Sequence, residues 1–400
     1  MNDMNPFDRP GGPPGGPHDA PPGGTPGGTP GSMPAAPPAI HTVTYDGRAG
    51  DLGRIAVSNG LLGLLTLGIY RFWGKTRLRS YLWSRVDFLG DRFEYSGTAK
   101  ELLIGFLVAL AILAPLVGAS IAVGMFYEND LGAVAIKELV QLVVILFLIQ
   151  LAIYRARRYR LTRTQWRGIR GGQSGSAFKY GFLAFGWMFV VFVTLGLAYP
   201  VYRTQMQRYR TENTWFGDRR FEFDGRASDI FGRWFVTWLC WLPTAGLIYV
   251  WYRVHELRYF VSRTRYGALR FNSELSTGSV LGIYLLFYLA LSLVVGVATG
   301  LATGLMPALS SAYRDLASAD TAAILANDLT VNLVLIAVIA LVVVALGMVR
   351  ILVYVHPLFR VVCNSLKVAG EEDYAAIAQS QQLMPGRGEG FADALDVGAF

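Results

Sequence analysis

The residues of this chain that could carry chemistry complete none of the catalytic motifs they begin. Gly74-Lys75-Thr76 ends like a phosphate-binding loop, but Ile69 stands where that loop requires its first glycine. His255-Glu256 begins like a zinc-protease helix, but Tyr259 stands where the second histidine is required. Since we find no nucleophile, base or metal-ligand constellation, we expect the protein not to be an enzyme and to need no cofactor or metal.

Basic and aromatic residues form a pattern that suits binding to anionic headgroups. Arg71, Lys75 and Arg79 follow one another at every fourth residue, with apolar residues at helical spacing between them, which predicts an amphipathic helix. We expect this helix in the inner-leaflet interface, because aromatic rings prefer the headgroup level and long basic side chains reach phosphates from it. Two interpretations stay open: selective binding of an anionic lipid, or anchoring and orientation of the protein. With its equivalents further along the chain, the candidate interface residues are Arg71, Trp73, Lys75, Arg77, Arg79, Tyr81, Arg85, Arg203, Tyr209, Trp251, Arg253, Tyr259 and Arg263.

Two further arginines are weaker candidates for a site within the membrane. Arg233 and Arg350 lie near the ends of apolar segments, where their side chains can reach the interface and are better suited to anchoring than to holding a ligand. The central parts of the apolar segments otherwise hold almost no Asp, Glu or His. This argues against a proton relay and leaves a facilitator or a pore open.

The composition is that of a membrane protein. The 400 residues are 53% hydrophobic and 16% charged, with a mean hydropathy of +0.37, whereas soluble domains carry about a quarter charged residues. The net charge is +8, and the basic residues adjoin apolar segments. We therefore expect anionic membrane lipids, and not nucleic acid, as partners. The sequence indicates no protein partner and no oligomeric state.

One block is written three times in the chain. Thr66-Leu67-Gly68-Ile69-Tyr70 is followed, at spacings of 128 and 178 residues, by similar blocks at 194–199 and 244–249. Each copy ends an apolar stretch and opens a basic, aromatic one. We predict a repeated membrane domain at 41–368, with repeat units near 43–100, 180–225 and 223–278.

The number of apolar segments conflicts with the side of the membrane that the basic connections favour. The connections 74–101, 155–179, 203–229 and 253–278 are dense in Arg and Lys, so the positive-inside rule favours the cytoplasm for all four. If every apolar segment crossed the bilayer once, consecutive basic connections would lie on opposite sides of the membrane, against this rule. Either the segments that end in the repeated block re-enter the bilayer, leaving four spans and both termini in the cytoplasm, or they cross and some basic connections lie outside. The apolar segments are 54–73, 102–126, 138–154, 180–202, 231–252, 279–306 and 331–355.

Short alternating stretches predict a few strands beside the helices. Residues 43–45, 92–95, 220–223 and 269–272 place aromatic side chains on one face, and isolated strands would be unstable, so we expect them to pair. The predicted fold class is an all-α membrane protein, a multi-pass helical bundle built from internal repeats. It would carry basic interfacial helices and a small cytoplasmic β element.

Both ends of the chain have the composition of tails. Residues 1–40 are dominated by Gly, Pro and Ala and lack the apolar core of a signal peptide, which predicts a disordered tail. Residues 369–400 are polar and acidic, which predicts an exposed C-terminal tail on the cytoplasmic side.

The repeated block resembles a known family. The block, Trp73 with the arginine-rich helix after it, and the Phe93-x-Tyr95-x-Gly97 stretch resemble the bacterial YjgN family, the domain of unknown function 898. The likeness covers roughly residues 43–366, and the second copy departs from it with Pro200-Val201 where the first has Phe72-Trp73. The resemblance implies a multi-pass protein of the bacterial inner membrane. It supplies no activity and no catalytic residue.

Two functions suit this sequence. The first is non-enzymatic transport or permeation, because broken helices in repeated units can build a substrate site within the membrane. The alternative is a membrane scaffold or partner-docking protein that interacts with anionic lipids.

Overall fold

The computed structural model describes residues 39–127, 130–316, 321–370, 374 and 377–379. The expected disordered tail at 1–40 lies outside the described residues except for its last two, and so does most of the expected tail at 369–400. Within the described part of the chain, one order of elements recurs: two helices joined by a turn, then a β-hairpin. The predicted helical bundle therefore consists of helical hairpins, each of which leads into one or more short strands.

The elements are as follows. α1 (Ala49–Leu65) and α2 (Arg71–Ser84) precede β3 (Val86–Phe88) and β4 (Asp91–Tyr95). α3 (Ala99–Phe126) and α4 (Leu131–Thr162) precede β5 (Thr164–Trp166) and β6 (Ile169–Gln173). α5 (Ala177–Val193) and α6 (Tyr199–Glu212) precede β7 (Thr214–Phe216), β8 (Arg219–Arg220) and β9 (Glu222–Phe223). α7 (Ser228–Cys240) and α8 (Ile248–Ser262) precede β10 (Thr264–Tyr266) and β11 (Leu269–Ser273). Finally α9 (Thr277–Leu316), α10 (Thr321–Val349), the π-helix η1 (Arg350–Val355) and α11 (His356–Asn364) precede β12 (Leu366–Ala369). Two further strands, β1 (Ile40–Thr42) and β2 (Thr44–Tyr45), come before α1, and β1 pairs with β12.

The strands form a closed antiparallel ring. One sheet runs β1-β12-β11-β10-β9 and the other β2-β3-β4-β5-β6-β7-β8. Only Val43 separates β1 from β2, and only Phe221 separates β8 from β9, so the two sheets join at both ends. The all-α fold class is therefore wrong in this respect. The strands are so short that each is stable only through its neighbours, and pairing between distant hairpins leaves no periodic signal in the sequence.

Aromatic side chains fill the ring. Phe88, Trp166, Phe216 and Tyr266 each stand just before a hairpin turn, and their successive ring centroids are 5.4, 6.1 and 6.2 Å apart. Tyr374, from the C-terminal part of the chain, packs against Phe88 and Trp166. The interior is thus a packed aromatic core and not an opening.

The repeated sequence block is a helix-ending turn. Leu67 (φ 52°) and Gly68 (φ 86°) are left-handed; the Gly68 N–H donates to Gly63 O at 2.6 Å and the Leu67 N–H to Leu64 O at 3.1 Å. This is the Schellman arrangement, which satisfies the last carbonyls of a helix. The other two copies repeat it, with φ values of 50° and 91° at 195–196 and of 47° and 80° at 245–246. The block therefore reverses the chain three times in the same way.

Helix lengths separate two kinds of helical pair. Four helices are long and apolar enough to cross a membrane: Ala99–Phe126, Leu131–Thr162, Thr277–Gly304 and Ile336–Asn364 in the described residues. The helices that end in the repeated block, α1, α5 and α7, have 17, 17 and 13 residues. Even 17 residues rise only about 26 Å, less than a hydrocarbon core of about 30 Å. These lengths fit the re-entrant alternative, although re-entry itself stays a prediction.

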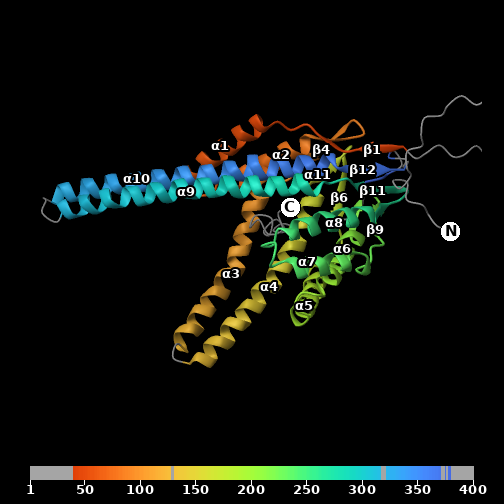
Figure 1. The fold of residues 1–400 in the computed structure, drawn as a ribbon, viewed down its shortest axis with the longest axis horizontal. Coiled ribbons are helices and arrows are strands. Elements are labelled where there is room, and N and C mark those ends of the chain that lie inside the picture. Colours follow the sequence, from red (N-terminus) through yellow and green to blue (C-terminus); the bar gives the residue numbers. More distant parts are fainter. Residues whose placement is uncertain (1–38, 128–129, 317–320, 371–373, 375–376, 380–400) are drawn as a thin grey trace, which may run out of the picture.

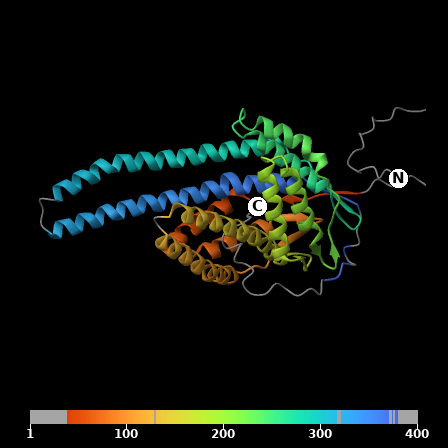
Figure 2. The same ribbon diagram turned by 90° about the horizontal axis from the view of Figure 1, so that it is seen from below.

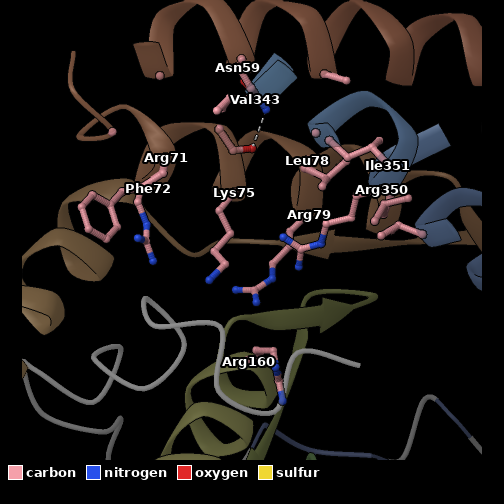
Figure 3. A pocket seen from close by; sticks show the side chains of 18 of the residues that line it. Asn59, Arg71, Phe72, Lys75, Leu78, Arg79, Arg160, Val343, Arg350 and Ile351 are labelled. Carbon is pink, nitrogen blue, oxygen red and sulfur yellow. Dashed lines mark hydrogen bonds between the residues drawn. The ribbon is translucent and has the colours of Figure 1, made fainter. Parts of the chain in front are cut away.

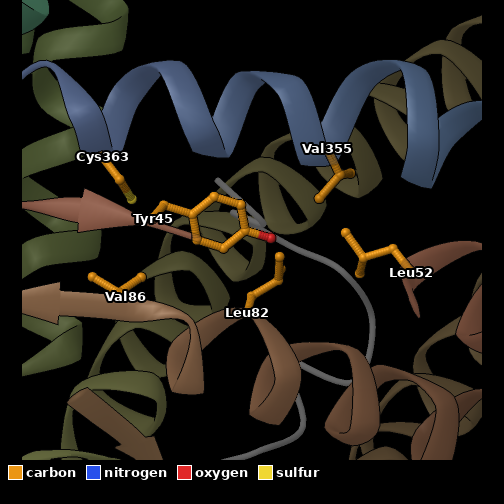
Figure 4. Close-up of a cluster of buried hydrophobic side chains, with 6 residues drawn as sticks. All are labelled: Tyr45, Leu52, Leu82, Val86, Val355 and Cys363. Carbon is orange, nitrogen blue, oxygen red and sulfur yellow. The ribbon is translucent and has the colours of Figure 1, made fainter. Parts of the chain in front are cut away.

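The strands gather at one end of the molecule and the helices extend from it (Figure 1; Figure 2). The pairs α3/α4 and α9/α10 diverge as they leave the ring (Figure 1). A cluster of buried side chains joins the two ends of the chain, since Tyr45 and Leu52 meet Val355 and Cys363 beside Leu82 (Figure 4). The Tyr45 N–H also donates to Asn364 Oδ1 at 2.8 Å. The first and last helical pairs are thereby neighbours.

Candidate functional site

A cavity of about 860 Å³ lies between the first helical pair, the end of α4 and the α10–η1 helix (Figure 3). Its most distinctive property is charge, because six of its lining residues are cationic and none of the described residues that line it is acidic. The six are Arg71, Lys75, Arg79, Arg157, Arg160 and Arg350. We call them the cavity cations. Cationic side chains such as these form charge-assisted hydrogen bonds with anionic groups.

Helix α2 supplies three of the cavity cations as a ladder. Arg71, Lys75 and Arg79 project from one face of α2 into the same space (Figure 3), and four residues of helix rise by about 6 Å. α2 lies close to α1 because Gly74 has no side chain: an added Cβ would be 2.8 Å from Asn59 Cγ. The Asn59 Nδ2 group donates to Gly74 O at 3.1 Å. The helix thus holds its ladder against α1.

The other cavity cations come from distant parts of the chain. Arg157 and Arg160 lie in the last turns of α4, and Arg350 is the first residue of the π-helix η1. The Nε atom of Arg157 is sealed from solvent and has no hydrogen-bond partner among the described residues. A buried donor without a partner is costly and calls for an acceptor. π-Helical turns are also frequent at functional sites.

One wall of the cavity is apolar. It consists of one face of α1 with its turn (Gly60, Gly63, Leu64 and Leu67) and of Val343 and Gly347 from α10. An added Cβ at Gly63 or Gly347 would meet no other atom within 4 Å. The cavity is therefore amphipathic, with a cationic end and an apolar groove.

Arg203 and Arg253 belong to a different environment, a buried ion-pair cluster. Arg203 binds both carboxylate oxygens of Glu256, Nε to Oε1 at 2.8 Å and Nη2 to Oε2 at 3.1 Å, and Arg253 binds the same carboxylate. Glu256 is only 1% exposed. Burial alone would lower the pKa of Arg203, but Glu256 outweighs it and holds that pKa above its ordinary value. Arg203 thereby ties α6 to α8, whereas the contact of Arg253 with Glu256 lies within α8.

Tyr81, Tyr209 and Tyr259 form one repeated latch. Each phenol accepts a hydrogen bond from a backbone N–H 33 residues earlier, that of Arg48 (2.9 Å), Ser176 (3.1 Å) and Arg226 (2.6 Å) respectively. The latch fastens the second helix of each pair to the start of the first. Burial and the hydrogen bond to Asp229 raise the pKa of Tyr259 to about 12.

The remaining candidates from the sequence do not meet at one place. Trp73 is 39% exposed and stacks on Tyr70, and Arg77 donates to Ser58 Oγ at 3.3 Å on the opposite face of α2 from the cavity. Arg233 is exposed on α7. Arg85 and Arg263 lie over the rings of Tyr81 and Tyr259, and Trp251 packs on His255.

The sequence therefore identified four of the six cavity cations as candidate site residues and did not identify the other two. Arg157 and Arg160 belong to a connection that was recognised as basic, and their spacing of three residues could have signalled a shared helix face. Nothing in the sequence could have matched that face to α2. No group of three His, Cys, Asp or Glu side chains that could hold a metal occurs in the described part of the chain.

Comparison with known proteins identifies a family and a relative of this chain. The model of a bacterial protein family of unknown function, DUF898, matches residues 40–252 and 242–384. The chain is 32% identical over 72 residues to "Inner membrane protein YjgN" of Salmonella typhimurium (strain LT2), a match that covers 18% of each chain. No solved structure matches.

Proposed function

This chain belongs to the DUF898 family of bacterial proteins of unknown function, and we propose that it is a non-enzymatic inner-membrane protein that binds an anionic ligand in its cationic cavity. Four long apolar helices support a membrane location. The relative is named an inner membrane protein, which supports the inner membrane as the location, and the match covers 18% of that relative. The family resemblance seen in the sequence is confirmed by the family match.

The sealed Arg157 Nε carries the proposal. A guanidinium keeps its proton at neutral pH, so it needs an acceptor or a counter-charge when it is removed from water. Arg157 is one of six cations around a cavity that is partly walled by apolar side chains. An anion seated there would accept the missing hydrogen bond of Arg157. Charge-assisted hydrogen bonds of this kind are among the strongest in proteins.

We propose that the β ring faces the cytoplasm. The end of α4 nearest the ring carries four arginines between 155 and 160, whereas the far turn of the α3/α4 pair carries Asp130 and the adjacent ion pair Lys137–Glu138. Cytoplasmic ends of membrane helices are enriched in Arg and Lys. In this orientation Gln379, whose side chain accepts from the Arg170 N–H on the ring, puts the C-terminal part of the chain in the cytoplasm.

Binding of a water-soluble anionic headgroup tests the proposal. The protein is placed in nanodiscs of zwitterionic phosphatidylcholine and titrated calorimetrically with glycerophosphoglycerol. We expect saturable binding that Arg157→Gln and Arg350→Gln each weaken about tenfold, the loss of one charge-assisted contact. Arg233→Gln, which removes an exposed arginine, serves as the control and leaves binding unchanged. Equal binding by all four proteins would contradict a ligand in the cavity.

Transport of the bound anion is a second candidate function. It is favoured by the ladder on α2, which spaces cations by about 6 Å between the exposed turn at Leu67 and the ring. It is also favoured by Arg350, a charge within the candidate span Ile336–Asn364, since charges within spans mark substrate pathways. Movement of a fluorescent anionic lipid between leaflets of reconstituted vesicles tests it. Binding without movement leaves the scaffold alternative.

A further inference from the structure

We infer that the ligand is an anionic phospholipid that enters sideways from the bilayer and lays an acyl chain in the groove between α1 and α10. The inference rests on the proposed function, because it assigns the cavity cations to the headgroup. It adds the source of the anion and the path by which it arrives.

The groove has the composition and the space for a hydrocarbon chain. Gly60, Gly63 and Leu64 face it from α1, and Val343 and Gly347 from α10. The two helices approach closely at one point, where an added Cβ on Gly60 would lie 3.0 Å from Val344. One turn further along α1, an added Cβ on Gly63 would meet nothing within 4 Å. The helices thus touch at Gly60 and leave a slot beside it.

The slot adjoins an apolar turn that is exposed to its surroundings. Leu65 is 80% exposed and Leu67 is 94% exposed, and Leu67 also lines the cavity. Apolar side chains exposed together at the tip of a helical pair are typical of a surface that contacts an apolar medium. In the re-entrant arrangement this tip lies in the hydrocarbon layer, so the mouth of the slot opens to lipid and not to water.

The groove and the cations stand at the right separation for one amphiphilic molecule. Gly347 in the groove and Arg350 at the cationic end are three residues apart on one continuous helix, about 4.5 Å of rise. Arg79 and Arg160 bound the same cationic end (Figure 3). A headgroup phosphate among these arginines therefore leaves its acyl chain next to the glycines. A free phosphate would contact the cations and leave the apolar groove unused.

Filling the groove separates the lipid from a free anion. Gly63→Leu and Gly347→Leu each place a side chain in the slot without a clash at the Cβ. Binding of phosphatidylglycerol is measured by native mass spectrometry after release from phosphatidylcholine nanodiscs, and binding of glycerophosphoglycerol by calorimetry. Each methylene group that loses its buried site lowers affinity about fourfold, so we expect at least a tenfold loss for the lipid and none for the soluble headgroup. Gly118→Leu, on α3, where an added Cβ also meets nothing within 4 Å, is the matched control.

The outcomes distinguish the two levels of the proposal. Lipid affinity that falls while headgroup affinity holds supports the groove. If both variants bind the lipid as the wild type does, or lose both ligands equally, the groove inference is wrong and anion binding still stands. If the wild-type protein binds neither ligand, the proposed function itself fails.

Discussion

The first helical pair and the α6/α8 region use the same helix in opposite ways. The spacings of 128 and 178 residues that relate the repeated blocks also relate α2 to α6 and α8, and each of these helices ends two residues before a strand. Lys75 thus corresponds to Arg203 and Arg253. In α2 this cation lines the cavity, and in α6 and α8 it binds the buried carboxylate of Glu256.

Two substitutions account for the difference. Where α2 has Gly74, α6 has Tyr202 and α8 has Tyr252, and Tyr252 is only 1% exposed. Where α2 has Leu78, α8 has Glu256, the carboxylate that neutralises both arginines. The tyrosine side chains occupy the positions that correspond to Gly74, and the Glu256 carboxylate neutralises the arginines. The first pair has neither residue at these positions, so a cavity and a structural joint differ at very few positions of an otherwise similar helix.

The largest expected effect comes from removing the acid that closes the α6/α8 region. Glu256→Gln leaves Arg203 and Arg253 without their shared carboxylate in a buried place, and breaking a buried ion pair costs about 3–5 kcal/mol. We expect the free energy of unfolding in detergent to fall by that amount. Arg233→Gln, at an exposed position, changes it by less than about 0.5 kcal/mol. A change of similar size in both variants would mean that the ion-pair cluster does not stabilise this joint.

The next effect comes from installing that acid in the first helical pair. Leu78→Glu copies the residue of α8 into the cavity, where its carboxylate should pair with the cavity cations and compete with the ligand. We expect headgroup affinity to fall about tenfold, or about 1.4 kcal/mol. Leu78→Gln has the same shape without the charge and should keep most of the affinity. If the two variants bind equally, the cavity does not select for charge.

The same comparison explains how far the sequence could be understood in advance. The ladder on α2 and the aromatic strands follow from local periodicity, so the ladder and the four stretches at 43–45, 92–95, 220–223 and 269–272 were recognisable. Local patterns also predicted apolar segments at the four helices that are long and apolar enough to cross a membrane. They depend on residues a few positions apart, which share a face by the geometry of the element itself.

What could not be predicted depends on contacts between distant residues. Arg79 and Arg157 line the same cavity although 78 positions of sequence separate them, and β1 and β12 pair although they are more than 300 residues apart. The ring was therefore underestimated as a small β element. Glu256 attracted notice only as the second residue of an incomplete zinc motif, because its partner Arg203 lies on another helix.

The smallest expected effect concerns what the two regions share, the tyrosine latch. Tyr259→Phe removes the phenol that donates to Asp229 at 2.6 Å and should lower the free energy of unfolding by about 1 kcal/mol at neutral pH. The raised pKa of Tyr259 means that the folded state holds the phenol proton more tightly than the unfolded state, whose pKa is about 10. The stabilisation is therefore complete below pH 10 and is lost as the pH rises towards 12.

Comparison with a second latch isolates the contribution of the acid. At the position of Asp229 the α5/α6 pair has Lys179, and Tyr209 donates to Ser176 O at 3.0 Å, as Tyr259 also does to Arg226 O. Burial raises the pKa of Tyr209 without help from a carboxylate. The difference in stability between wild type and Tyr259→Phe, followed from pH 9 to 12 by denaturant unfolding, should shrink more than the difference for Tyr209→Phe. Equal slopes would show that the latch works through the backbone contact alone, and the two regions would then share a purely structural device.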